Sequence, residues 1–107
     1  MNIGGKERKL KFGINQSITY CEILNIDISD MDESFQRMAN GKGTGTELRA
    51  LFYSALKDGA RIEKSEFNYT VEDIGDWLDE VTPEEIQVAI GEMVSTLAKG
   101  KNVAKKK

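Results

Sequence analysis

The chain has 107 residues, the length of one average domain, and its 39% hydrophobic and 31% charged residues are typical of a globular protein. It contains no histidine and one cysteine, Cys21, which excludes an internal disulfide and removes the commonest general base and metal ligand. No apolar run approaches the roughly 18 residues that a membrane-spanning helix needs, so we expect no membrane association and no signal peptide.

The net charge of −3 conceals three regions of different charge. Residues 1–12 carry four Lys or Arg and one Glu, residues 63–92 carry ten acids and one Lys, and residues 93–107 carry five Lys and no acid. Because the acidic region repels a polyanion and the basic ends are short, we expect no nucleic-acid partner. We predict one globular domain at residues 1–98 and a disordered basic tail at residues 99–107, which either adds solubility or contacts an acidic partner.

The first expected element is a β-hairpin within residues 1–12. Gly4 and Gly5 suit a two-residue turn, and Leu10 and Phe12 alternate with lysines as in a strand. Two strands are marginal in water, so the hairpin must pack against the rest of the chain.

A helix is expected at residues 14–26, where apolar side chains recur at helical spacing. Its stripe consists of Ile14, Ile18, Cys21 and Leu24. We expect this stripe to face the core, and Cys21 to be a core residue rather than a nucleophile, because no histidine can activate it.

Residues 27–32, Asp-Ile-Ser-Asp-Met-Asp, raise the question of a calcium site. An EF-hand loop needs oxygen ligands at positions 1, 3 and 5 and Gly at position 6, and a loop that begins at Asp27 or Asp30 does not meet this pattern. We predict instead that Asp30 caps a short helix, with Glu33 at N3, that ends at Gly41. The buried stripe of this helix consists of Met31, Phe35 and Met38.

Residues 40–46, Asn-Gly-Lys-Gly-Thr-Gly-Thr, place three glycines before a helix, an arrangement that binds phosphate in some proteins. A P-loop needs Ser or Thr after its lysine and a buried strand before the loop, but Gly43 follows Lys42 and a polar helix precedes it. A dinucleotide fingerprint also fails, because the third glycine comes one residue early. We predict a flexible loop in which Thr44 or Thr46 caps the next helix.

That helix has the strongest pattern in the chain, and we interpret Gly59 as its stop signal. Its stripe consists of Leu48, Leu51, Phe52, Ala55 and Leu56. Residues 60–69 are expected to form a polar connection, with Phe67 and Tyr69 as possible anchors.

Two further helices are predicted, each with a threonine at its N-cap. Thr70 begins the first, whose stripe is Val71, Ile74, Leu78 and Val81. Trp77 lies beside this stripe, and we interpret it as a core side chain, with a partner contact as the alternative. Thr82 begins the second, with Pro83 at N1 and Glu85 at N3. Its apolar residues are Ile86, Ala89, Ile90, Met93, Val94 and Leu97.

The predicted fold is α+β and mostly α, with a short N-terminal β-hairpin followed by four to five amphipathic helices. The many carboxylates fall on helix faces, where a solvated acidic surface is the ordinary arrangement. Because no motif meets its structural context, we predict no enzyme, no metal and no cofactor.

Three segments resemble the tail assembly chaperones of long-tailed, siphovirus-like bacteriophages and prophages. They are residues 1–13, Met-Asn-Ile-Gly-Gly-Lys-Glu-Arg-Lys-Leu-Lys-Phe-Gly, residues 48–58 and residues 69–80. Members of that family begin with a similar hairpin, in which Asn and Tyr take the places of Gly4 and Arg8. The order and spacing of the segments, over about residues 1–98, carry the resemblance.

The resemblance implies a non-enzymatic protein in the cytoplasm of the host bacterium. Such chaperones bind the long, largely helical tape measure protein, keep it soluble until tail tube subunits polymerise around it, and are not expected in the mature virion. We therefore expect the tape measure protein as partner, tail tube protein as a further partner, and a homo-oligomer. The alternatives are a small intracellular adaptor or regulatory protein and a phage head–tail structural component.

The predicted partner surface combines a tryptophan, the last helix and the basic tail. Its residues are Trp77, Ile86, Ile90, Met93, Leu97, Lys105, Lys106 and Lys107. An apolar helix of this width either packs on two neighbouring helices or offers part of its surface to a partner.

Overall fold

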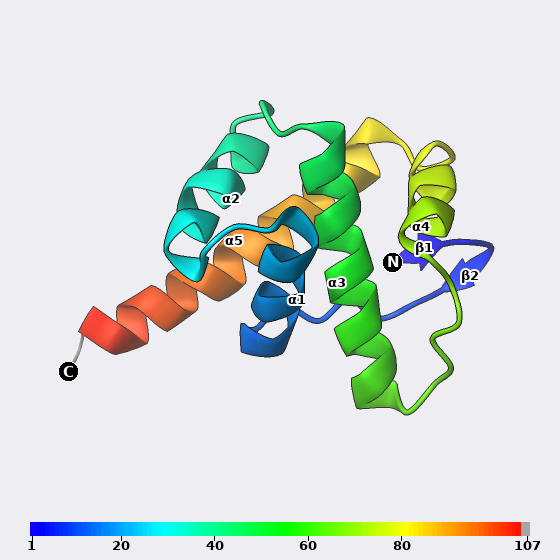
Figure 1. Cartoon of the computed structure of the whole chain (residues 1–107), viewed down its shortest axis with the longest axis horizontal. Helices are drawn as coiled ribbons and strands as arrows, with labels where there is room; N and C mark the ends of the chain where they lie inside the picture. The colour runs from blue at the N-terminus through cyan, green and yellow to red at the C-terminus, as the bar shows by residue number, and fades with distance from the viewer. Residues whose placement is uncertain (106–107) are drawn as a thin grey trace.

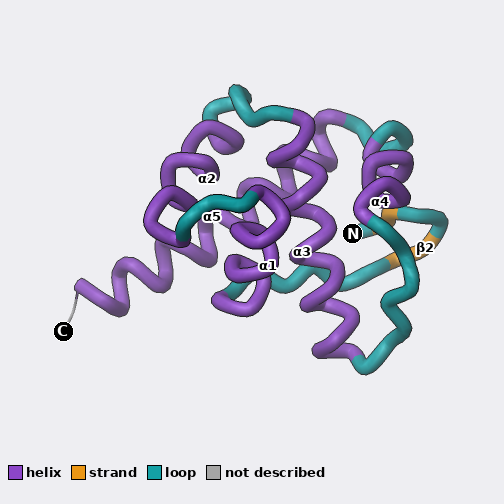
Figure 2. Tube along the Cα trace, viewed as in Figure 1, coloured by secondary structure: helices purple, strands orange, loops and turns teal. Residues whose placement is uncertain are grey.

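A computed structural model describes the backbone of residues 1–105 and the side chains of residues 1–96. Over that range the chain forms a two-stranded hairpin, five α-helices and one 3-10 turn (Figures 1 and 2). The elements are β1 (Asn2–Ile3), β2 (Lys6–Glu7), α1 (Ile14–Leu24), η1 (Ile28–Asp30), α2 (Met31–Ala39), α3 (Gly45–Glu63), α4 (Val71–Leu78) and α5 (Pro83–Lys105). The predicted fold class, mostly α with an N-terminal hairpin, is confirmed.

The hairpin is shorter than predicted. Ile3 and Lys6 pair as neighbours in two antiparallel strands. Gly4 and Gly5 form the turn between the strands, and their φ angles of 65° and 85° suit glycine. The strand ends at Glu7, because residues 8–12 leave the hairpin and cross α3. There the backbone N–H of Lys11 donates a hydrogen bond to the carbonyl oxygen of Ala55 at 3.1 Å.

Gly59 lies inside α3, so the predicted stop signal is wrong. The helix continues to Glu63 and is followed by Lys64 with a left-handed φ of 56°, which shortens the predicted polar connection. A Cβ atom at Gly59 would lie 2.0 Å from the carbonyl oxygen of Lys9. This glycine therefore allows the segment after the hairpin to cross α3 in direct contact.

Helix α3 lies at the centre of the molecule (Figure 1). The buried side chains form two clusters, and α3 contributes to both. The α1–α2 cluster consists of Tyr20, Cys21, Phe35, Met38, Ala50, Leu51, Ile90 and Met93. The hairpin–α4 cluster consists of Ile3, Phe52, Leu56, Ile74 and Ala89. The stripes predicted for α2 and α3 are buried, with Met31 and Leu48 partly so, and α5 contributes to both clusters.

The stripe predicted for α1 is wrong in its first half. Ile14 and Ile18 are 64% and 45% exposed, whereas Gln16 and Tyr20 are buried. The physical reason is that the polar side chains of Gln16 and Tyr20 form hydrogen bonds with buried groups of other helices. The amide Nε2 of Gln16, for example, donates a hydrogen bond to Ser54 Oγ at 3.0 Å.

The predicted N-caps are confirmed at three helices, and at α2 Asp30 holds the predicted N-cap position without a side-chain bond. In each confirmed case a threonine hydroxyl accepts the backbone N–H of a residue three positions later, whose carboxylate accepts the threonine N–H in return. The pairs are Thr44–Glu47, Thr70–Asp73 and Thr82–Glu85. The side chain of Asp30 makes no capping bond, because η1 leads directly into α2. Gly41 follows α2 with a φ of 73°, as its predicted C-terminal position requires.

Helix α5 continues to Lys105, beyond residue 98, where we expect the globular domain to end. Its last turns project from the body, at the far end of the molecule from the hairpin and α4 (Figure 1). The side chains from residue 97 onward lie outside the described part of the chain, so the division into a domain and a basic tail stays a prediction. No described helix combines the length and apolar character needed to cross a bilayer.

Candidate protein-binding surface

Two of the predicted contact residues of α5 lie in the interior. Ile90 and Met93 are 3% and 1% exposed within the α1–α2 cluster, and Ile86 is half-buried between the two clusters. A partner could reach Ile90 and Met93 only if α5 moved away from the body. Four predicted residues lie outside the described side chains, and their role as contacts stays a prediction: Leu97, Lys105, Lys106 and Lys107.

Trp77 is half-buried and holds the hairpin against α4. A Cβ atom at Gly4 would lie 2.6 Å from Trp77 Cδ2, so the turn packs directly on the indole ring. The guanidinium of Arg8 lies 4.6 Å from the Trp77 ring centroid and 5.0 Å from that of Tyr69. Edge-on and tilted ring contacts continue this packing along the series Trp77, Tyr69, Phe67 and Tyr53.

The outer face of α1 adjoins a groove against the C-terminal half of α3. This groove, the α1–α3 groove, has a volume of about 550 Å³. Its apolar lining is Ile18 and Phe67, and its polar lining includes Asn15, Thr19, Lys57, Asp58 and Arg61. Ile14 lies one helical turn before Ile18 and is also exposed, so two isoleucines of α1 stand at the surface beside the groove.

A buried carboxylate orients one cation of this groove. Asp58 is 5% exposed, and its Oδ1 accepts a hydrogen bond from Arg61 Nε at 2.7 Å. Its Oδ2 lies 4.0 Å from Lys11 Nζ and has no hydrogen-bond partner among the described residues. Lys11 and Arg61 offset the cost of burying Asp58. Lys57 and Arg61 are the exposed cationic side chains that line the groove.

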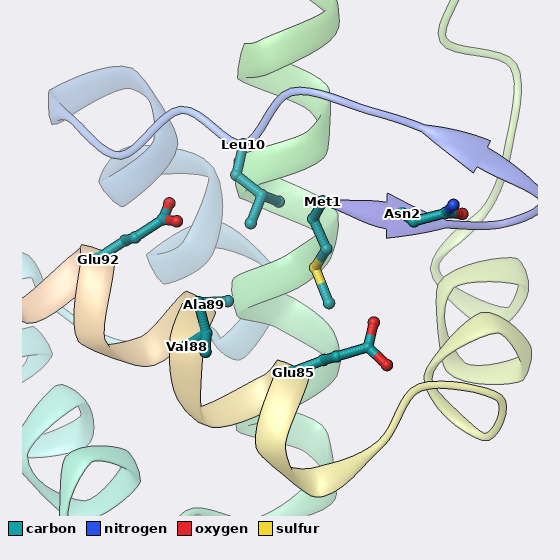
Figure 3. A pocket seen from close by; sticks show the side chains of 7 residues that line it. All are labelled: Met1, Asn2, Leu10, Glu85, Val88, Ala89 and Glu92. Atoms are coloured by element: carbon teal, nitrogen blue, oxygen red, sulfur yellow. The ribbon is translucent and has the colours of Figure 1, made fainter.

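A second hollow, of about 230 Å³, lies between the N-terminal segment and α5 (Figure 3). Met1 and Leu10 face Val88 across it, and Glu85 and Glu92 stand on α5 at its two ends (Figure 3). Its charged side chains are therefore acidic, in contrast to those of the α1–α3 groove.

A buried chain of hydrogen bonds links the first three helices. The hydroxyl of Tyr20 pairs with that of Ser34, Ser34 donates to Glu47 Oε2, and Arg37 Nη2 donates to the same oxygen at 2.7 Å. Burial opposes ionisation of Glu47, but these donors and the Thr44 N–H outweigh it and lower its pKa to about 2. Burial raises the pKa of Tyr20 to about 12. Both groups are thus fixed in one charge state near neutral pH, which suits a structural role rather than proton transfer.

Two further features concern reactive groups, the thiol of Cys21 and the grouping of possible metal ligands. Cys21 is buried, as predicted, and desolvation raises the pKa of its thiol, which disfavours the reactive thiolate. Among the described side chains, no three Cys, Asp or Glu residues lie close enough together to hold a metal ion.

Sequence reasoning missed the α1–α3 groove because it assigned Ile14 and Ile18 to the core. A competing signal was present, since Gln16 and Tyr20 also lie four residues apart on one helical face. The spacing of Gln16 and Tyr20 indicates the buried face of α1 only when Ser54 is known to be the hydrogen-bond partner of Gln16, and Ser54 lies 38 residues further along the chain.

No protein-family model, curated protein or solved structure that was compared with this chain matches it.

Proposed function

We propose that this protein is a tail assembly chaperone of a long-tailed bacteriophage or prophage, which binds the tape measure protein and keeps it soluble during tail tube assembly. The observation that carries the proposal is the resemblance over about residues 1–98, in which the similar segments follow one another in the family's order. In this chain those segments form the hairpin, the central helix α3, and the Thr70 cap with helix α4.

The surface of the folded chain supports a binding role that involves no chemistry. Helical clients commonly dock by placing an apolar stripe in a groove between helices. The α1–α3 groove offers such a place, with Ile14 and Ile18 exposed along α1. Because α1 has 11 residues, or about 16 Å of helix, it can accompany roughly three turns of a client helix.

The proposal includes a location and further partners. The protein acts in the cytoplasm of the host bacterium, is absent from the mature virion, encounters tail tube subunits as they replace it on the tape measure protein, and self-associates. Holding a long client at many weak sites requires many copies, which is the physical reason to include self-association.

Co-expression with the longest helical open reading frame of the same gene cluster tests the proposal. We expect the long protein to become soluble and to co-purify with several copies of this chain, whereas the long protein expressed alone remains insoluble. An insoluble, unbound client beside a folded, helical chain contradicts the proposal and favours an adaptor. Recovery of this chain from purified, mature particles favours a head–tail structural component instead.

A further inference from the structure

We infer that the α1–α3 groove binds an acidic amphipathic helix of the client, with the client's apolar stripe on α1 and its carboxylates on α3. The inference rests on the proposed function, because it names the surface that holds the client and the charge of the segment it holds.

The apolar half of the site is the outer face of α1. Ile14 and Ile18 stand four residues apart, on the same helical face, with 64% and 45% of their surface exposed. Phe67, from the loop after α3, lines the groove together with Ile18. A helix that places a leucine-type stripe here removes these side chains from water without any rearrangement of the core.

The charged half of the site is positive. Lys57 and Arg61 lie one turn apart on α3 and line the groove, while the acid between them, Asp58, is buried and paired with Arg61 and Lys11. Residues 63–92, by contrast, carry a net charge of −9 from ten acids and one lysine. The groove therefore attracts an acidic segment, and its spacing matches carboxylates three or four residues apart on a helix.

Arg61 is oriented before a partner arrives. Asp58 accepts the Nε–H of Arg61 at 2.7 Å, and the terminal nitrogens of Arg61 make no hydrogen bond to the described residues. A guanidinium fixed through Nε keeps its terminal N–H groups for an incoming carboxylate, and less side-chain entropy is lost on binding. Asp58, which lines the groove and is 5% exposed, thus holds Arg61 in an orientation suited to a partner carboxylate.

The first test uses a labelled synthetic peptide of about 18 residues, five helical turns, with a leucine stripe flanked by glutamates four residues apart. A matched peptide carries lysines in place of the glutamates. Fluorescence anisotropy with the full chain should show binding of the acidic peptide, weakened by salt, and none of the basic peptide. Equal binding of the two peptides, or none of the acidic one, overturns the inference.

Variants then locate the site. Lys57→Glu should weaken binding of the acidic peptide about tenfold, because it replaces an attraction by a repulsion at an exposed position. Lys42→Glu makes the same charge change on the exposed loop before α3 and should bind as the wild type does. Ile18→Ala should also weaken binding, whereas Ile28→Ala, an exposed isoleucine of η1, should not. If the Lys57→Glu variant binds the acidic peptide with wild-type affinity, the inference is overturned.

Co-expression with the client separates this inference from the proposed function. If the wild type solubilises the client and the Lys57→Glu variant does not, the proposed function and the groove inference both stand. If both chains solubilise it equally, the chaperone proposal stands and the groove is the wrong surface. If the wild type fails with the client, the proposed function fails, and the client inference fails with it. If sedimentation shows wild-type dimers that Lys57→Glu abolishes, the groove holds an acidic helix of a second copy, and the client inference is overturned.

Discussion

The two sides of α3 are packed in different ways. Toward the hairpin and α4, the helix buries Phe52 and Leu56 against apolar and aromatic side chains. Toward α1 and α2, it buries Ser54 and Glu47, which form hydrogen bonds to Gln16 and Ser34. Both sides remove apolar area from water, which has no directional preference, but the second side adds hydrogen bonds with fixed geometry.

This difference accounts for the exposed isoleucines of α1. If α1 turned to bury Ile14 and Ile18, Gln16 and Tyr20 would leave their partners in the interior. An unpaired buried polar group costs about 1–3 kcal/mol, comparable to the gain from burying one isoleucine. The polar side thus fixes the rotation of α1, and the α1–α3 groove is its consequence.

The largest effect is expected from Gly59→Ala, which tests the close crossing of α3. The added Cβ would lie 2.0 Å from the carbonyl oxygen of Lys9, a backbone atom that can move only if the N-terminal segment shifts. We expect a loss of about 3 kcal/mol or more in the free energy of unfolding, measured by urea denaturation.

A matched glycine serves as the control for this change. Gly91 lies in α5 with no atom within 4 Å of the position its Cβ would take. Gly91→Ala should therefore stabilise the chain by about 0.5–1 kcal/mol through helix propensity alone. A stabilised Gly59→Ala variant would mean that the segment after the hairpin does not contact α3.

The next largest effect depends on pH and tests the hydrogen bonds on the side of α3 that faces α1 and α2. Glu47→Gln should lower the free energy of unfolding by about 2 kcal/mol at pH 7, since it weakens charge-assisted bonds to Ser34, Arg37 and Thr44. Because folding lowers the Glu47 pKa from 4.5 to about 2, its stabilisation is complete above pH 4.5 and is lost as the pH falls toward 2. The difference between wild type and variant should shrink over that window.

Glu85→Gln is the control for the pH experiment. Glu85 also accepts hydrogen bonds from a threonine N-cap, but its side chain is exposed, so its loss should cost less than about 1 kcal/mol. If the effect of Glu47→Gln is as large at pH 3 as at pH 7, Glu47 does not act as a buried anion.

A smaller effect is expected from Gln16→Leu, which replaces a buried amide by an apolar side chain of similar size. Ser54 Oγ already donates to the carbonyl of Leu51 at 2.9 Å, so its hydroxyl proton keeps a partner when the amide is removed. We expect a change of less than about 1 kcal/mol in urea denaturation. A loss of about 3 kcal/mol would show that Gln16 alone fixes the rotation of α1.

The parts of the fold that were predicted correctly depend on neighbours in the sequence. The Gly4–Gly5 turn, the threonine caps and the stripes of α2 and α3 are set by residues a few positions apart. The errors depend on distant residues. Lys9 explains the need for Gly59, and the contacts of Gln16 with Ser54 and of Tyr20 with Ser34 explain the rotation of α1. No local period in the sequence contains these pairs.

The candidate surface was harder to predict for a related reason. Ile90 and Met93 lie on an apolar stripe, and such a stripe looks the same whether it faces the core or a partner. Lys57 and Arg61 are visible in the sequence as cations one turn apart, but only the fold brings them beside Ile18.

The smallest expected effect is the one that tests this orientation of α1 most directly. Ile18→Ala and Ile74→Ala delete the same atoms, at a side chain that is 45% exposed and at one that is fully buried. Ile74→Ala should cost about 3 kcal/mol through the cavity it leaves, whereas Ile18→Ala should stay within about 0.5 kcal/mol of wild type, because alanine also favours the helix. Urea denaturation of the two variants measures the difference. Equal losses would mean that Ile18 is buried, which would remove the apolar wall of the α1–α3 groove and the client site inferred there.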